Sequence, residues 1–427
     1  MKKINILLSL TLIFTIILSM MKPQSTKAVE KDLQVESRYV TIYSLKEHSA
    51  VYEQKAHEQM YPASMTKIMT TLVALEHIDD LHKKIVLGKD IFEGLEEEGA
   101  SVAGYDVDDK AELIDLLYGT MLPSGADASR AVAKYVAGSE EAFVKLMNEK
   151  VAQLKLEHTH FMNTTGLHHD NHYSTTADMA KILETALKNK TFYEIFTANE
   201  FTSADGQMHF VNTRESILDI IHGDSNSIIG SKTGYTLEGG LCLASLMRIN
   251  EEDYIVISGY AGNDFSTMQH YKDAVTISKF IDTQYERKTV YHANDPIRIV
   301  PITYGNADEV QSVIHEDITI LVRKGEELEE TILMDTITAP VNTKEPIAQL
   351  QITSKSITAK HIYPLYAIEA VSRNWIDYLL HARWFYVCVI LFSILTLIFF
   401  IGKPRIVRTY RRIKRSRLRR KKRRVKR

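Results

Sequence analysis

The spacing of apolar positions divides the first two thirds of the chain into alternating and helical sections. Residues 38–54 alternate around a polar turn at 46–49, which predicts two short strands. Apolar residues then recur at helical spacing in four stretches: Ser64–Ile78, Glu112–Gly119, Ala126–Ala137 and Glu141–Leu154. Strand-like stretches return at Ser227–Thr236, Leu241–Ile249 and Tyr254–Gly262, before an amphipathic helix from Met268 to Tyr285. This order predicts an α+β domain at 31–287, in which both ends of the segment build one antiparallel sheet around an inserted helical region.

The pattern changes after this domain. Between Val290 and Val371, short alternating stretches such as Asp317–Gly325 and Ile347–Thr353 are interrupted by prolines. We therefore predict a small β-rich domain at 290–371. Neither a nucleophile–base pair nor a metal motif is evident in it, so we interpret it as a spacer.

The N-terminal pattern is that of an export signal. Lys2 and Lys3 precede about 18 mostly apolar residues, and a polar stretch then ends at the small residue Ala28. We predict a signal peptide at residues 1–28. An uncleaved anchor helix is the alternative, because 18 residues is long for the apolar core of a signal peptide.

The C-terminal pattern predicts a membrane span. Trp384–Ile401 carries no charge, and 18 helical residues extend about 27 Å, close to the hydrocarbon thickness of a bilayer. The segment 403–427 then holds 16 basic residues and no acidic one. The positive-inside rule places this tail in the cytoplasm, against anionic lipid, and both domains outside the cell. We expect a protein of the cell membrane that crosses it once after signal cleavage.

The charge balance supports this division. The net charge is only -2, yet the segment between Ile4 and Gly402 contains 54 acidic residues and only 34 basic ones. Because the basic residues form one terminal block, a nucleic-acid partner is not expected. Two distant cysteines indicate no disulfide framework.

One local motif places a nucleophile beside a base. Ser64 and Lys67 lie one helical turn apart, so their side chains share a face. A serine hydroxyl needs a base within hydrogen-bond reach, and a lysine serves when burial and a nearby positive charge lower its pKa. Alone, S-x-x-K is weak evidence, because a helix-capping serine and a solvated lysine have the same spacing.

Two further motifs follow in order. Ser124-Gly125-Ala126 resembles an S-x-N element, and Lys232-Thr233-Gly234 forms a K-T-G on a predicted strand. The set S-x-x-K, S-x-N and K-T-G is the signature of penicillin-binding proteins and serine β-lactamases. A phosphate-loop interpretation of GSKT fails, because the first glycine is absent and the context is a strand.

The chain resembles the low-molecular-mass penicillin-binding proteins that are serine-type D-alanyl-D-alanine carboxypeptidases of the peptidase S11 type. The resemblance covers YPASMTKIMT, ASVAGYDVDDKAELIDLLYGTMLPSGADAS, FMNTTGLHHDNHYSTTADMA and GSKTGYTLEGGLCLAS, and more weakly the β-rich domain. It implies a β-lactamase/transpeptidase-like fold. It also implies that terminal D-alanine is removed from peptidoglycan stem pentapeptides ending in D-Ala-D-Ala, that β-lactam antibiotics inhibit covalently, and that no cofactor is used.

The resemblance also assigns roles to residues. Ser64 attacks the carbonyl between the two D-alanines and Lys67 takes its proton, while Ser124 relays a proton towards the leaving amine. On the third motif, Lys232 and Thr233 hold the substrate's carboxylate. The N–H groups of Ser64 and Tyr235 form the oxyanion hole. Gly234 lies between Thr233 and Tyr235 and also belongs to the substrate-binding residues.

Ala126 departs from the family's pattern, which has Asn at this position. In the family, that amide ordinarily contacts the base lysine and the substrate, so the sequence leaves open both how Lys67 is oriented and how efficiently the substrate is positioned. Asp127 is the next residue on the helix and is expected to point elsewhere. Besides an active carboxypeptidase, the alternatives are a β-lactamase or endopeptidase on the same fold, and a catalytically weak penicillin-binding sensor.

A histidine cluster raises the possibility of zinc. It comprises His158, His160, His168, His169 and His172. The spacing matches no zinc arrangement, and the cluster lies in a predicted loop rich in Gly, Asn and Thr. We expect surface histidines and no metal.

Overall fold

The computed structural model describes residues 33–223, 227–357 and 359–424. The predicted signal peptide, residues 1–28, lies outside the described residues. The chain forms two compact units. One extends to Lys288 and also includes Leu321–Glu329 and Thr353–Lys360; the other contains Thr289–Ile320, Glu330–Ile352 and the chain from His361 onward.

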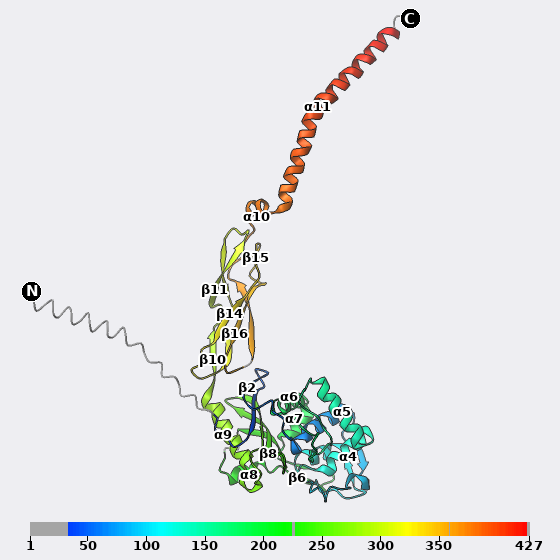
Figure 1. Ribbon diagram of the computed structural model, residues 1–427, viewed down its shortest axis with the longest axis vertical. Helices are drawn as coiled ribbons and strands as arrows, with labels where there is room; N and C mark the ends of the chain where they lie inside the picture. Colours follow the sequence, from blue (N-terminus) through cyan, green and yellow to red (C-terminus); the bar gives the residue numbers. More distant parts are fainter. Residues whose placement is uncertain (1–32, 224–226, 358, 425–427) are drawn as a thin grey trace, which may run out of the picture. The chain divides into compact units, whose positions relative to one another are not determined.

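A five-stranded antiparallel sheet forms the centre of the first unit, in the order β2-β1-β9-β8-β7. Strands β2 and β8 of this sheet are labelled in Figure 1. Its strands are β1 (Tyr39–Ser44), β2 (Ser49–Gln54), β7 (Ile228–Thr236), β8 (Gly240–Ile249) and β9 (Glu252–Gly259). In the register of β1 and β9, Tyr39 lies opposite Gly259. The N-terminal hairpin therefore completes a sheet whose other strands lie about 200 residues later, which confirms the predicted assembly from both ends.

The central strands of this sheet are buried on both faces. Along β8, Cys242, Ala244 and Leu246 belong to one apolar core, and the alternate residues Leu243 and Met247 belong to another. The first core is shared with the inserted helical region, and the second with α9 (Gln269–Gln284). A strand that is buried on both faces reads as a continuous apolar run, as GLCLASLM does.

The helical region follows the predicted order with two additions. Its helices are α2 (Lys67–His77), α3 (Leu113–Met121), α4 (Ala126–Ala137), α5 (Glu140–Gln153), α6 (Thr176–Leu187) and α7 (Lys190–Thr197). The helix predicted from Ser64 begins instead as a 3-10 turn, η1 (Ala63–Thr66). Sequence analysis missed α6 and α7, although Thr175 caps α6 by accepting a hydrogen bond from the N–H of Asp178.

Short elements fill the connections of the first unit. They are β3 (Lys84–Val86), η2 (Lys89–Ile91), β4 (Lys110–Glu112), β5 (Glu200–Thr202), β6 (His209–Val211), α8 (Arg214–Ile220) and η3 (Phe265–Thr267). Strand β3 pairs with β4 and β5 with β6, as two small hairpin-like sheets apart from the main one.

The region after the sheet domain is β-rich, as predicted. Its strands are β10 (Tyr285–Tyr291), β11 (Pro296–Thr303), β12 (Glu309–Val313), β13 (Ile318–Arg323), β14 (Glu329–Leu333), β15 (Ile337–Thr338), β16 (Pro346–Thr353) and β17 (Lys360–Ala367). Six of them form one sheet, in the order β14-β16-β17-β12-β11-β15. Leu321 and Ile357 join the apolar core that contains α9, which explains why their segments belong to the first unit.

Two helices complete the described chain: α10 (Trp375–His381) and the long α11 (Arg383–Arg424) (Figure 1). Within the described residues, Arg383–Ile401 is the one helical segment long and apolar enough to cross a membrane, and its side chains are exposed. One such helix fits anchoring of the protein in a membrane.

Candidate active site

The candidate nucleophile lies on a tight turn next to a buried lysine. Ser64 is partly exposed on η1, whereas Lys67, at the start of α2, is only 2% exposed. Their side chains meet, with Lys67 Nζ 3.1 Å from Ser64 Oγ. Ala63, just before the serine, has a φ of 48°, a left-handed conformation that non-glycine residues rarely adopt. Such local strain is common where a reactive side chain must be presented.

The backbone carbonyl of Thr165 fixes the position of Lys67. Lys67 Nζ donates to this oxygen at 2.7 Å, and Ser64 Oγ lies 3.5 Å from it. The pKa of Lys67 is well below its usual range, first because burial disfavours the charged form and second because Lys232 is nearby. A neutral amine with one N–H held by a carbonyl can turn its lone pair towards the serine hydroxyl.

Asn163 shapes the loop that carries this carbonyl. Its Oδ1 accepts from the N–H of Gly166 at 2.7 Å and from the N–H and hydroxyl of Thr165 at 3.2 Å each. Its Nδ2 donates to the carbonyl of Leu167 at 2.9 Å. Gly166 has a φ of 85°, and a Cβ there would lie 1.9 Å from the carbonyl oxygen of Ala63. The loop can therefore press against the nucleophile turn only with glycine at this position.

A second set of contacts holds the loop from behind. Glu140 Oε1 accepts from the N–H of Thr164 at 2.9 Å and from its hydroxyl at 2.7 Å. Arg130 Nε lies 3.1 Å from Glu140 Oε2. On the other side, the hydroxyl of Thr70, one turn after Lys67, donates to the Thr164 carbonyl at 2.7 Å. These contacts fix the loop relative to both α2 and α5.

The K-T-G residues bring a second lysine to the site. They lie on β7, the edge strand, and a Cβ at Gly234 would lie 3.1 Å from the backbone nitrogen of Ser64. Lys232 is 3% exposed, and its Nζ donates to the carbonyl of Thr233 at 3.1 Å. Burial lowers the pKa of Lys232 to about 7. A buried cation beside a serine and a strand edge can bind a substrate carboxylate.

The other predicted residues of β7 are more exposed. Thr233 is partly exposed, and Tyr235 is 37% exposed, with its hydroxyl donating to the carbonyl of Asn263 at 2.9 Å. Because neighbouring side chains of a strand point to opposite faces, Thr233 and Tyr235 do not share the direction of Lys232.

The middle motif is built differently from the loop at 163–167. Ser124 has a φ of 66°, and its Oγ is buried without a hydrogen-bond partner among the described residues. Ala126 is 1% exposed and offers only a methyl group. Asp127 points away from the serine, as expected, and its carboxylate accepts from the N–H groups of Ala103, Gly104 and Tyr105. It does not replace the amide that Ala126 lacks.

The histidine cluster does not converge. Within the described residues, no group of three or more His, Cys, Asp or Glu side chains is placed to hold a metal ion. His172 is not on the surface, contrary to expectation, but 2% exposed. Its Nδ1 accepts from the N–H of Met162 at 3.3 Å, so Nε2 carries the proton and donates to Thr66 Oγ1 at 2.8 Å. Burial lowers its pKa to about 3, so this neutral ring ties the loop to η1.

The structure thus brings together Ser64, Lys67, Lys232 and Gly234. Sequence analysis missed three residues that hold the loop and the lysine, Glu140, Asn163 and Thr165, and it expected His172 on the surface. The run N-T-T-G in FMNTTGLHHDNHYSTTADMA was the only visible signal of the loop, because Asn and Gly close together indicate a turn. A backbone carbonyl that acts across the fold leaves no signal of its own in a sequence.

Comparisons with known proteins identify the family. Residues 25–259 match the family described as peptidase S11, D-alanyl-D-alanine carboxypeptidase, and residues 285–373 match the C-terminal domain of penicillin-binding protein 5. The chain is 31% identical over 332 residues to the D-alanyl-D-alanine carboxypeptidase DacF of Bacillus subtilis (strain 168), covering 75% of this chain and 82% of that protein. The chain belongs to the peptidase S11 family of serine D-alanyl-D-alanine carboxypeptidases, a family of hydrolases.

Solved structures agree on the fold. Penicillin-binding protein 5 from Haemophilus influenzae superposes with a TM-score of 0.60 at 21% identity, covering 80% of this chain and 98% of that one. The Streptomyces K15 DD-transpeptidase superposes with a TM-score of 0.52 at 26% identity, covering 58% and 97%. The predicted transpeptidase-like α+β fold with a β-rich C-terminal domain is confirmed.

Proposed function

We propose that this carboxypeptidase removes the terminal D-alanine from peptidoglycan stem pentapeptides through an acyl-enzyme on Ser64. The observation that carries this assignment is the contact of Ser64 Oγ with Lys67 Nζ at 3.1 Å, within a site that lowers the pKa of the lysine well below its usual range. A neutral amine at that distance can accept the hydroxyl proton as the serine attacks.

In the acylation step, Ser64 Oγ bonds to the carbonyl carbon between the two D-alanines. Lys67 takes the hydroxyl proton, and the Thr165 carbonyl keeps Nζ in place during the transfer. The C–N bond then breaks, and the leaving amine receives a proton from Lys67 through Ser124, whose unpartnered hydroxyl is free for this relay. The backbone N–H groups of Ser64 and Tyr235 stabilise the oxyanion. Water then hydrolyses the ester and releases the shortened peptide.

Lys232 gives the site its preference for a free C-terminus. Its charged form pairs with the substrate's terminal carboxylate, with Thr233 donating from the strand edge and Gly234 leaving room beside Ser64. Because the body of the protein is acidic, this pairing must act at short range. By the same chemistry, a β-lactam, which carries a carboxylate beside a reactive amide, acylates Ser64 as a covalent inhibitor.

The proposed setting is the outer face of the cell membrane. Residues 1–28 act as the signal peptide, 31–287 as the catalytic domain and 290–371 as the β-rich spacer. Residues 384–401 span the membrane and 403–427 form the cytoplasmic basic tail. The apolar helix Arg383–Ile401 and the positive charge that follows it support this arrangement. The site requires neither metal nor cofactor, because the lysine supplies the base.

Release of D-alanine from a pentapeptide ending in D-Ala-D-Ala tests the activity. The full-length protein should release one D-alanine per peptide over many turnovers, and Ser64→Ala should release none above background. Stoichiometric binding of penicillin without D-alanine release would instead indicate a sensor protein. Rapid, repeated hydrolysis of a chromogenic β-lactam would indicate a β-lactamase.

A further inference from the structure

A short helix just before the membrane-spanning segment exposes an apolar surface. On α10, Trp375 is 62% exposed, Ile376 74% and Leu380 50%. Ile376 and Leu380 are four residues apart and therefore lie on the same side of the helix. Side chains of this size are seldom left together in water without a partner.

This helix is fixed to the β-rich unit rather than hanging from it. The backbone N–H of Asn374 donates to the carbonyl of Tyr304 at 2.8 Å, and Arg373 Nε donates to the carbonyl of Ala339 at 2.7 Å. The Arg373 guanidinium lies 5.2 Å from the ring centre of Trp375 and 4.5 Å from that of Tyr378. Tyr378 also packs edge-on against Tyr304. The orientation of α10 is thus set by the fold of the unit.

The position of α10 along the chain brings it to the bilayer surface. It ends at His381, and the apolar span begins at Arg383, so only Ala382 separates them. Two residue steps cover at most about 7 Å, which is comparable to the depth of the headgroup region. The two helices are also connected directly, because the Tyr386 hydroxyl donates to the Leu380 carbonyl at 2.5 Å.

We propose that α10 lies in the headgroup region of the outer leaflet, with Trp375, Ile376 and Leu380 inserted among the lipids. Its attachment to Tyr304, Ala339 and Arg373 then holds the β-rich unit against the membrane surface. This inference rests on the proposed membrane span. Tryptophan and large aliphatic side chains next to a span suit this interface, where one end of the ring is apolar and the other is hydrated.

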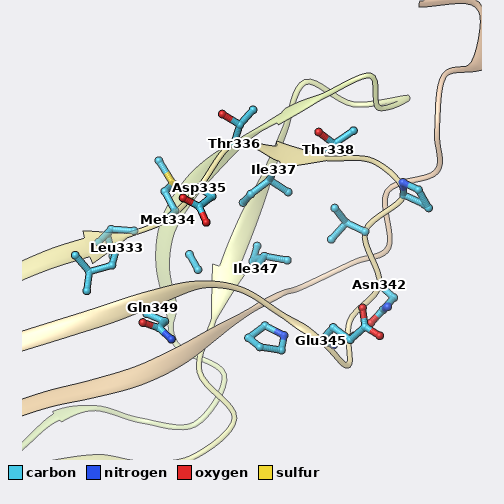
Figure 2. Close-up of a pocket in the computed structure, with 15 residues that line it drawn as sticks. Leu333, Met334, Asp335, Thr336, Ile337, Thr338, Asn342, Glu345, Ile347 and Gln349 are labelled. Carbon is cyan, nitrogen blue, oxygen red and sulfur yellow. Dashed lines mark hydrogen bonds between the residues drawn. The ribbon is translucent and has the colours of Figure 1, made fainter. Parts of the chain in front are cut away.

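The hollow in the same unit is not the lipid contact. It encloses about 800 Å³ and is lined by Leu333 and Met334, but also by Asp335 and Glu345 (Figure 2). Two carboxylates would be costly to insert among acyl chains, whereas the exposed side of α10 formed by Ile376 and Leu380 carries no charge.

The chain contains only two tryptophans, Trp375 and Trp384, so its intrinsic fluorescence reports on these two positions alone. Full-length protein would be reconstituted into vesicles of phosphatidylcholine and phosphatidylglycerol, with and without brominated acyl chains. In Trp384→Phe, the remaining Trp375 should emit at blue-shifted wavelengths and lose roughly half of its intensity to the brominated lipid. Ile376→Ser with Leu380→Ser should weaken that quenching, whereas Ile299→Ser, at an exposed position of β11, should not.

The reciprocal variant separates this inference from the proposed span. In Trp375→Phe, lipid quenching of Trp384 shows that α11 is inserted. Quenching of Trp384 with a water-exposed Trp375 would overturn the docking of α10 alone. A Trp375 shielded from acrylamide but not quenched by lipid would also overturn it and would indicate a protein partner, such as a second copy. If neither tryptophan responds to lipid, the membrane span itself is wrong.

Discussion

The loop 163–167 and the middle motif Ser124–Ala126 are built in opposite ways. The loop is held by Asn163 and Glu140, and the carbonyl of its Thr165 accepts from Lys67 at 2.7 Å. The middle motif has a methyl group at Ala126 and a buried Ser124 hydroxyl with no partner among the described residues. The loop is thus saturated with hydrogen bonds, whereas the middle motif keeps one hydroxyl unused. The difference indicates that the loop orients the base, while the Ser124 hydroxyl keeps its capacity to hydrogen-bond the substrate.

The most severe test of this comparison removes Lys67, the base that the loop 163–167 holds in place. Lys67→Met keeps a similar buried volume but loses the amine, so kcat for D-alanine release should fall about 10³-fold. Steady-state kinetics on a pentapeptide measures this loss, and thermal unfolding checks that the fold persists. Lys181→Ala, at an exposed lysine of α6, is the matched control and should keep full activity. A variant at Lys67 with near-normal kcat would contradict the role of the base.

The second prediction concerns the lysine that faces the substrate. Lys232→Met should raise KM and lower kcat/KM by about 10² to 10³, because a buried charge-assisted contact to the carboxylate is lost. With the native enzyme, a substrate amidated at its C-terminus should show a similarly lowered kcat/KM, because it lacks the carboxylate. If Lys232→Met changed kcat/KM equally for the amidated and the free peptide, the carboxylate would be bound elsewhere.

The two lysines also predict the pH dependence. Lys67 must be neutral, so kcat/KM should fall at low pH, as the pH drops through its lowered pKa. Lys232 must be charged, and its pKa is about 7, so kcat/KM should also decline as the pH rises above about 7. A bound carboxylate favours the charged form of Lys232, so the alkaline decline of kcat should lie at higher pH. If Lys232→Met left the alkaline decline of kcat/KM at the same pH, the assignment of that decline to Lys232 would be wrong.

A smaller effect is expected when the support of the loop is weakened. Asn163→Ala should slow acylation by penicillin about tenfold, because the Thr165 carbonyl loses its fixed position. Water admitted to the site should also raise the pKa of Lys67, so the fall of kcat/KM at low pH should begin at a higher pH. Asn163→Asp retains the accepting oxygen but loses the N–H that donates to the Leu167 carbonyl, so it should recover only part of the rate. Asn171→Ala, at an exposed position of the same region, should have no effect.

The smallest effect is expected at the middle motif. Ala126→Asn supplies the amide that the family usually carries, and because Lys67 is already oriented, turnover should be kept or raised by a few-fold. Steady-state kinetics would show this beside the native enzyme. A clear drop would mean that the methyl group at Ala126 is itself adapted to the substrate.

Sequence patterns predicted what depends on local spacing. The helix Ala126–Ala137, the three C-terminal strands of the sheet and the pairing of Ser64 with Lys67 follow from periodicity and motif. What they could not predict depends on contacts distant in sequence. Thr165 lies 98 residues from Lys67, and it acts through a carbonyl that every residue has. His172 looked like a surface residue, because polar neighbours do not reveal that its ring is packed against η1 and Phe161.

The acylation of Ser64 tests the central claim most directly. The full-length protein would be incubated with labelled penicillin, digested and mapped by mass spectrometry. We predict one adduct per chain on the peptide that contains Ser64, absent in Ser64→Ala and formed far more slowly in Lys67→Met. An adduct at another residue, or labelling that persists in Ser64→Ala, would contradict the account.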